Sequence, residues 1–431
     1  MTGNLAAPAT VSAEADDALL EIVQRQTFRY FWEGAHRPSG LARDRQKTTG
    51  DPSNDLVAIG GSGFGFMAIV VAVTRDWISR DAALDRLGAM LSCLEQATRY
   101  RGMFAHFING RTGQTIPFGR KDDGADVVES ALLFQGLLCV RQFFDRATFV
   151  EGSLRQRIDR LWQEAEWDFY RRDGGNHLYW HWSPNHGFVM NQKITGWNEG
   201  LIAYVLAAGS PSHPIDAEVY HQGFASGPGF RNGRSYYGIE LPLGMEFGGP
   251  LFLAHYSFCG LDPRGLSDRY ADYFEQNVRH TQINHRHCVA NPHGHKGYGH
   301  DCWGLTSGHS PSGYVAHAPD NDIGVITPSA ALSSFSYTPE EAMRALRSFS
   351  AKPTNRIWGR FGFVDAFSES RNWFARTFLA VNQGPIVIML ENFRSGLLWD
   401  LFMAAPEVQI GLAKLGFTSP HMTKNRASIG S

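Results

Sequence analysis

The chain has 431 residues, 43% of them hydrophobic, which is enough for a large core and for one to three domains. Its 40 Lys and Arg against 42 Asp and Glu give a formal net charge of −2, and this balance excludes the basic excess of a nucleic-acid-binding protein. No apolar run approaches the roughly 20 residues that span a membrane, so no membrane insertion is expected.

The two ends of the chain differ in character from the rest. Residues 1–16 are Ala-rich and polar, without the basic start and apolar stretch of a secretory leader. The sequence as written therefore predicts a cytoplasmic protein, or a periplasmic one if a leader has been removed. We expect residues 1–17 to be disordered or extended and residues 419–431 to form a flexible tail. Five widely spaced Cys argue against a disulfide framework.

Between these ends, apolar residues recur at helical spacing along the whole length. In the first half this pattern predicts helices at 18–35, 63–74, 79–97, 125–145, 153–171 and 196–208. In the second half it predicts helices at 251–258, 268–288, 338–349, 373–381, 385–393 and 396–416, with Thr338 as an N-cap and Pro339 at the first helical position. Strand patterning is scarce, and only 178–181 and 235–240 are expected to be short hairpin strands.

About a dozen helices joined by loops of unequal length predict an all-α fold. We expect an (α/α)6 toroid, or barrel, formed by one catalytic domain over 18–418. The nearly all-apolar runs 63–74 and 385–392 suit its inner helices. A solenoid is the competing layout, but the sequence has no fixed-period repeat. The long loops would gather at one mouth of the toroid and build the site there.

The segment 122–129 concentrates four acids at the start of an apolar helix. Asp126 and Glu129 are three residues apart and so share one face of its first turns. Acids that stabilise a helix N-terminus are common, and that explanation competes for Asp122 and Asp123. Glu129 is flanked by apolar residues, so its carboxylate is expected to enter an enclosed space with a partner or a raised pKa, as a general acid requires.

A second candidate segment, 195–200, opens another apolar helix. Trp197 offers a flat face to a sugar, Asn198 offers an amide to hydroxyls, and Glu199 offers a carboxylate. The competing explanation is that Glu199 belongs to a capping box. The nearby Trp180 and Trp182 are further candidates for sugar stacking.

Other candidates lie further along the chain. Asp365 follows aromatic residues in a loop and is a reserve base, a hydroxyl acceptor or a turn former. The stretch 280–317 holds eight His and invites a zinc interpretation, but it lacks the paired spacing of a zinc motif, so no metal and no cofactor is expected. Trp303, His309, Phe64 and Arg120 complete the set of expected substrate-binding residues.

Eight ordered blocks of the sequence resemble one known family. They are 24–32, 61–65, 129–133, 197–199, 249–252, 302–306, 362–367 and 391–397. The chain, from about residue 20 to 417, resembles the glucoamylase-like family that includes the endo-β-1,2-glucanases of glycoside hydrolase family 144. The resemblance implies an (α/α)6 barrel that hydrolyses β-linked glucans, with Asp126, Glu129 and Glu199 facing one cleft. His309 stands where relatives often have an Asp, so subsite contacts can differ.

These observations together predict a glycoside hydrolase that acts on β-glucan, with β-1,2-linked glucose the best candidate. Glu199 is the expected general acid, and Glu129 or Asp126 the base or nucleophile, with Asp365 in reserve. An oligo- or polysaccharide is the expected partner, and the oligomeric state is not predicted. Two alternatives remain open at this point: a sugar isomerase or epimerase that uses the His cluster, and a glucan-binding protein without activity.

Overall fold

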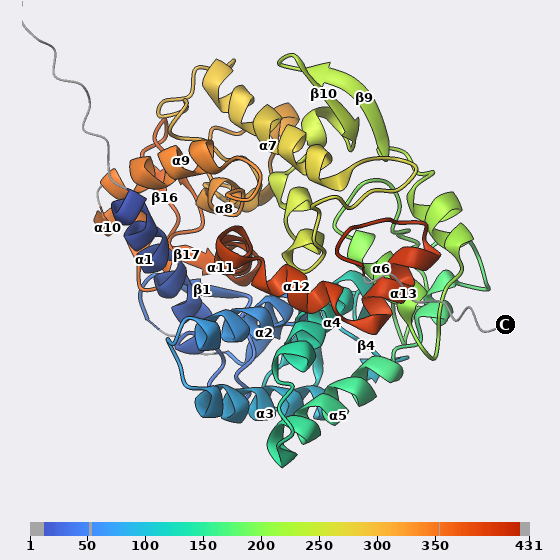
Figure 1. Cartoon of the computed structure of the whole chain (residues 1–431). Coiled ribbons are helices and arrows are strands. Elements are labelled where there is room, and N and C mark those ends of the chain that lie inside the picture. Colours follow the sequence, from blue (N-terminus) through green and yellow to red (C-terminus); the bar gives the residue numbers. More distant parts are fainter. Residues whose placement is uncertain (1–12, 51–53, 353, 423–431) are drawn as a thin grey trace, which may run out of the picture.

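The computed structural model describes residues 13–50, 54–352 and 354–422, and helices dominate it (Figure 1). The α-helices of this part of the chain are α1 (Ala13–Trp32), α2 (Ile59–Thr74), α3 (Arg80–Gln96), α4 (Val127–Phe143), α5 (Phe149–Gln163), α6 (Leu201–Gly209), α7 (Tyr273–Ala290), α8 (Pro328–Leu332), α9 (Pro339–Ala351), α10 (Thr354–Ile357), α11 (Ala380–Ser395), α12 (Leu397–Met403) and α13 (Pro406–Lys414). None of the described helices is both long enough and apolar enough to cross a membrane.

The strands are short and form small antiparallel sheets, eight of them in the described residues. They are β1 (Arg45–Lys47) with β17 (Thr377–Leu379), β2 (Leu56–Ala58) with β5 (Phe107–Asn109) and β6 (Thr115–Ile116), β3 (Arg99–Tyr100) with β4 (Met103–Phe104), β7 (Ala125–Asp126) with β8 (His181–Trp182), β9 (Arg231–Tyr236) with β10 (Ile239–Leu243), β11 (Ser307–Ser310) with β12 (Gly313–Ala316), β13 (Trp358–Gly359) with β14 (Gly362–Phe363), and β15 (Phe367–Ser368) with β16 (Trp373–Phe374). The fold is thus mainly helical, with more strand in the loops than the sequence predicts.

The core is built around α2, α4, α6 and α11, whose residues are nearly all buried. Glycines let α2 and α4 approach closely, because a Cβ at Gly63 would lie 2.1 Å from the carbonyl oxygen of Leu132 and one at Gly136 would lie 2.1 Å from that of Gly63. α11 packs against α2, and α6 packs against α4. In Figure 1, α2, α4 and α11 lie towards the middle, with α1, α3, α5, α7 and α9 around them.

The outer helices are amphipathic and bury one face each. α3 and α5 pack against each other and against α2 and α4, respectively. Their N-termini are capped by side chains: Ser79 accepts from the backbone N–H of Ala82, and Thr148 accepts from that of Glu151. α9 begins at Pro339 as predicted, but Thr338, at its N-cap position, makes no side-chain cap hydrogen bond.

Several predicted elements are wrong in kind or extent. α1 starts at Ala13, so residues 13–17 are helical instead of extended, while residues 1–12 lie outside the described part. Residues 153–171 split into α5 and a 3₁₀ turn (Trp167–Arg171), and 251–258 form 3₁₀ turns (Leu251–Ala254 and Ser257–Cys259). Residues 373–381 are mostly strand, because a short apolar run fits either structure. Residues 396–416 form α12 and α13, divided before Pro406. The strand predicted at 178–181 is displaced to β8 (His181–Trp182), and the stretch predicted at 235–240 is the turn of the β9–β10 hairpin with the adjoining strand ends.

Candidate active site

A cavity of about 780 Å³ opens where the N-terminal ends of the buried helices meet. Its size suits a short oligosaccharide. Its acidic lining residues are Asp44, Asp122, Asp126, Glu129 and Glu199; its aromatic ones are Phe107, Phe118, Trp180, Phe252, Tyr256 and Tyr314; and its basic ones are Arg45, His106, Arg120, Lys121 and His181. The expectation that Asp126, Glu129 and Glu199 share one cleft is therefore confirmed.

Asp126 is both the end of a strand and the cap of a helix. It ends β7, opposite His181 of β8, and is the N-cap residue of α4. Its Oδ1 accepts from the backbone N–H groups of Val128 (3.1 Å) and Glu129 (3.0 Å), and its Oδ2 lies 3.0 Å from Nδ1 of His106. Burial acts to raise the pKa of Asp126, but the hydrogen bond and charge of His106 outweigh it and the pKa is lowered. Asp126 thus caps α4, and both of its carboxylate oxygens already have partners.

Glu129 extends into the cavity one turn further along α4. Its Oε2 accepts from the backbone N–H of Gly60 at 2.7 Å, and its Oε1 lies 4.0 Å from Nε2 of His106. Burial and the neighbouring Asp126 carboxylate raise the pKa of Glu129, against the opposing effects of His106 and of the Gly60 N–H. Glu129 therefore has one oriented oxygen, Oε2, while Oε1 has no hydrogen-bond donor among the described residues and lies 4.0 Å from Nε2 of His106.

Glu199 lies in the turn just before α6, which begins at Leu201 with Gly200 as its N-cap residue. The capping-box explanation for Glu199 is therefore wrong. Asn198 holds the turn by accepting from the N–H of Gly200 (2.8 Å), and Ser257 donates to the backbone carbonyl of Glu199 (2.8 Å). These bonds fix the backbone while the carboxyl lines the cavity.

The carboxyl of Glu199 differs from the other two in its protonation. Burial raises the pKa of Glu199 to about 7, and the negative charges of Asp126 and Glu129 add to the rise. About half of the Glu199 side chains would therefore carry a proton near neutral pH. Such a group can donate a proton, whereas Asp126 at the same pH cannot.

Two further groups of the cavity were not singled out as candidates from the sequence. His106 follows β4 and precedes β5, and its ring packs against those of Phe107 and Phe118. Asp44, next to β1, also faces the cavity. Neither residue stands in a motif, so only the folded chain brings them to the acids. Asp122, treated in the sequence as a possible helix-end acid, lines the cavity and lies 3.4 Å from Nδ1 of His181.

Asp365 and His309 lie away from the cavity lining and bind each other. Oδ2 of Asp365 accepts from the backbone N–H of His309 (2.7 Å) and lies 2.9 Å from its Nδ1, and Oδ1 accepts from Asn382 (2.6 Å). Asp365 is 2% exposed. The structure therefore places Asp365 as a buried hydrogen-bonding centre that anchors β11, and gives it no position from which to act as a reserve base.

Of the tryptophans predicted to stack on sugars, one lines the cavity and two are buried away from it. Trp180 lines the cavity, with its ring stacked beside that of His181. Trp197 is buried against Tyr273, and Trp303 is buried with its indole N–H donated to the carbonyl oxygen of Glu341, so neither presents a face to substrate.

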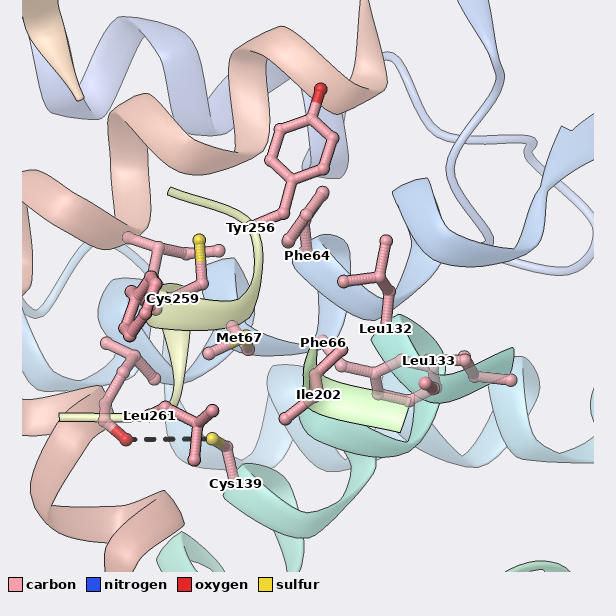
Figure 2. Packing of buried hydrophobic residues seen from close by; sticks show 14 of the residues in the cluster. Phe64, Phe66, Met67, Leu132, Leu133, Cys139, Ile202, Tyr256, Cys259 and Leu261 are labelled. Carbon is pink, nitrogen blue, oxygen red and sulfur yellow. Dashed lines mark hydrogen bonds between the residues drawn. The ribbon is translucent and has the colours of Figure 1, made fainter. Parts of the chain in front are cut away.

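Of the remaining substrate-binding candidates, some line the cavity and others do not. Trp182 packs against Tyr100 and does not line the cavity. The side-chain amide of Asn198 donates to the carbonyl oxygen of Thr195 within its own turn, and this residue does not line the cavity either. Phe64 is fully buried in the core, edge-on to Tyr256, and does not line the cavity; Figure 2 shows the two side chains side by side. Arg120 does line the cavity.

The histidines of 280–317 are dispersed among separate partners. His280 faces the carbonyl oxygen of Gly249 (3.0 Å), His287 lies 2.9 Å from Oδ2 of Asp322, and His317 lies 3.2 Å from Oγ1 of Thr327. Over the described residues, no group of three or more His, Cys, Asp or Glu side chains is placed to hold a metal ion.

Comparison with known proteins connects this geometry to one family. Residues 191–406 match the model of the "Glycoamylase" family, described as "Putative glucoamylase". The chain is 43% identical over 428 residues to an exo β-1,2-glucooligosaccharide sophorohydrolase (non-reducing end) of Parabacteroides distasonis. That match covers 94% of this chain and 59% of the relative, so the chain spans about three fifths of its length.

Two solved structures are similar over almost the whole chain. One is an endo-β-1,2-glucanase from Chitinophaga pinensis in complex with sophorotriose and glucose, with 50% identity and a TM-score of 0.92 over 96% of this chain and 100% of that one. The other, described as a "putative glucoamylase" from Bacteroides uniformis, has 52% identity and a TM-score of 0.92 over the same shares.

Proposed function

The chain belongs to the Glycoamylase family, and we propose that it is a glycoside hydrolase that cleaves β-1,2-linked glucan in the cavity at the starts of α4, α6 and α11. The observation that carries the proposal is the pair of unlike carboxyl groups in one cavity: Glu199 with a pKa near 7, and Glu129 oriented by the N–H of Gly60. The β-1,2 linkage is taken from what the names of its similar relatives state.

The two carboxyl groups have complementary tasks in acetal hydrolysis. A protonated carboxyl must protonate the leaving glycosidic oxygen, and a carboxylate must accept a proton from water or attack the anomeric carbon. Glu199 is the proposed general acid, because it retains its proton at a pH where Asp126 is ionised. Glu129 is the proposed base or nucleophile, because one of its oxygens faces the cavity while those of Asp126 cap α4 and bind His106.

Trp180, Tyr256 and Tyr314 are the proposed stacking and hydroxyl-binding groups, since their side chains line the cavity. Tyr and Trp rings combine an apolar face with a polar edge, which matches the C–H faces and hydroxyl groups of glucose. Trp197, Trp303 and Asp365 are not part of this proposal.

We further propose that residues 18–418 form one (α/α)6 toroid. Six buried segments would form the inner ring, and six amphipathic helices the outer ring. The inner set is α2, α4, α6, 251–259, α8 and α11, and the outer set is α1, α3, α5, α13, α7 and α9. Packing of α1 on α2 and α11, of α13 on α6, and of α8 on α9 supports this arrangement. It would explain why the acids, at the starts of α4 and α6, meet at one mouth.

A linkage panel tests the proposed function. The protein is incubated separately with β-1,2-, β-1,3-, β-1,4- and α-1,4-glucans and with free glucose, and product masses are measured. We expect short oligosaccharides from β-1,2-glucan alone. Cleavage of another linkage only, a product of unchanged mass from glucose, or binding of glucan without product would overturn the proposal. The sizes of the products also distinguish exo from endo action.

A further inference from the structure

The ring of His106 lies between two of the cavity carboxylates. Its Nδ1 lies 3.0 Å from Oδ2 of Asp126, and its Nε2 lies 4.0 Å from Oε1 of Glu129. The ring is held by Phe107, at 4.4 Å between ring centres, and by Phe118, at 4.8 Å. About a quarter of the side chain is exposed, so the imidazole forms part of the cavity wall.

We propose that His106 is a positioning residue that remains an imidazolium cation between Asp126 and Glu129, so that both carboxylates stay ionised and Glu129 is the one presented to substrate. The inference rests on the proposed function, because it assigns how the hydrolytic carboxylate is kept ready. It adds a residue to the site that neither the sequence motifs nor the names of the relatives indicate.

The geometry favours protons on both ring nitrogens. A neutral imidazole has one N–H and one lone pair. If Nδ1 donated to Asp126 in that form, the lone pair of Nε2 would face the Glu129 carboxylate, and the two would repel each other. With both nitrogens protonated, each faces an acceptor. The carboxylate of Asp126 then receives three donors: His106 and the backbone N–H groups of Val128 and Glu129.

The charges around the ring favour the cation. Asp126 and Glu129 face it from α4, and Asp44 adds negative charge from beside β1, while His181 of β8 is the opposing base near Asp126. Burial acts to lower the pKa of His106, but the attraction of Glu129 and Asp126 outweighs it and raises the pKa to about 10. The ring would then stay charged across the pH range of hydrolysis.

Removing that charge has a predictable effect on activity. Two carboxylates three residues apart would face each other without a cation, so Glu129 would ionise at higher pH. The acidic limb of the kcat/KM profile reports this ionisation in the free enzyme. As the pH falls, a variant without this charge would therefore lose activity at a higher pH than the wild type.

The decisive variant is His106→Asn, whose amide nitrogen can take the place of Nδ1 and keep the hydrogen bond to Asp126 without the charge. We expect the acidic limb on β-1,2-glucan to move upward by about one pH unit. The matched control is His36→Asn. His36 is a buried His that is likewise bonded to an Asp (Asp55, 3.0 Å), but it lies outside the cavity lining, and its loss should leave the limb in place. An unmoved limb in folded His106→Asn would overturn the proposal.

A measurement on the unmodified protein covers the case in which His106→Asn does not fold. In ¹⁵N-histidine NMR, we expect the His106 ring to keep the pattern of a doubly protonated imidazole above pH 8, with His106→Gln used to assign its signals. Deprotonation of that ring near pH 6.5 would overturn the proposal. If the wild-type protein cleaves no β-1,2-glucan, the proposed function fails, while the NMR result still decides the charge state.

Discussion

The backbone N–H of Gly60 donates to Oε2 of Glu129 at 2.7 Å, across 69 residues of sequence. Gly60 lies in the first turn of α2, and Glu129 in the first turn of α4. A Cβ at position 60 would lie 2.6 Å from that same oxygen. Position 60 therefore needs a glycine so that its N–H can reach the carboxylate.

Gly60→Ala should displace the Glu129 carboxylate and lower kcat by roughly 100-fold, because small misplacements of a reacting group are costly. Steady-state kinetics on β-1,2-glucan give the value. Gly88→Ala is the matched control, since Gly88 is also helical and a Cβ there meets no atom within 4 Å. Equal kcat values for the two variants would contradict this role of Gly60.

The raised pKa of Glu199 also has a consequence for stability. In the unfolded chain this Glu ionises near its ordinary value of 4.5, and in the folded protein near 7. As pH rises from about 4.5 to 7, the unfolded state loses its proton first, so the folded state is progressively destabilised. Glu199→Gln removes this cost and should stabilise the protein at pH 8 by roughly 1–3 kcal/mol.

Chemical denaturation at pH 8 and at pH 4.5 measures that difference. The gain in the free energy of unfolding should shrink to a small remainder at the lower pH, where Glu199 is protonated in the folded state and about half protonated in the unfolded state. A variant that is destabilised at pH 8, or equally stabilised at both pH values, would show that Glu199 is not held in a desolvating site.

Asp365 is expected to matter for stability more than for catalysis. Asp365→Asn places an amide against the donors of His309 and Asn382, and one of those donors then lacks an acceptor. We expect the free energy of unfolding to fall by about 1–3 kcal/mol, with kcat within about tenfold of wild type. The exposed Asp85→Asn is the control. A loss of kcat as large as that of Glu129→Gln, without loss of stability, would show that Asp365 is a catalytic residue.

Substitution of Trp180 should weaken substrate binding, whereas substitution of Trp197 should lower stability. Trp180 faces the cavity, so Trp180→Ala should raise KM about tenfold, with little effect on the unfolding temperature. Trp197 is buried against Tyr273, so Trp197→Phe should lower stability by about 1–3 kcal/mol and leave KM unchanged. Kinetics and thermal unfolding of both variants provide the comparison, and the reverse pattern would contradict the assignment of the two rings.

The acids of the site could be predicted from the sequence because each has a local signal. Glu129 is flanked by apolar residues in a buried helix, and Glu199 precedes another apolar helix. Helix periodicity alone implies that such carboxylates head buried elements. The family resemblance then brings those elements to one cavity.

What the sequence could not supply is the direction of neighbouring side chains in irregular structure. Trp197, Asn198 and Glu199 are consecutive, yet only Glu199 lines the cavity, because the turn before α6 directs each side chain differently. His106 stands alone between two short strands, so no spacing marks it. Its importance arises from contacts with Asp126 and Glu129, about 20 residues away.

The proposed protonation of the leaving oxygen by Glu199 can be tested by changing the leaving group. The rates of Glu199→Gln and of wild type are measured on β-1,2-glucan and on dinitrophenyl β-sophoroside, whose leaving group needs no proton, with exposed Glu240→Gln as control. We expect Glu199→Gln to lose about 1,000-fold on glucan and less than about tenfold on the aryl glycoside. Equal losses on both substrates, or no loss on glucan, would contradict the assignment.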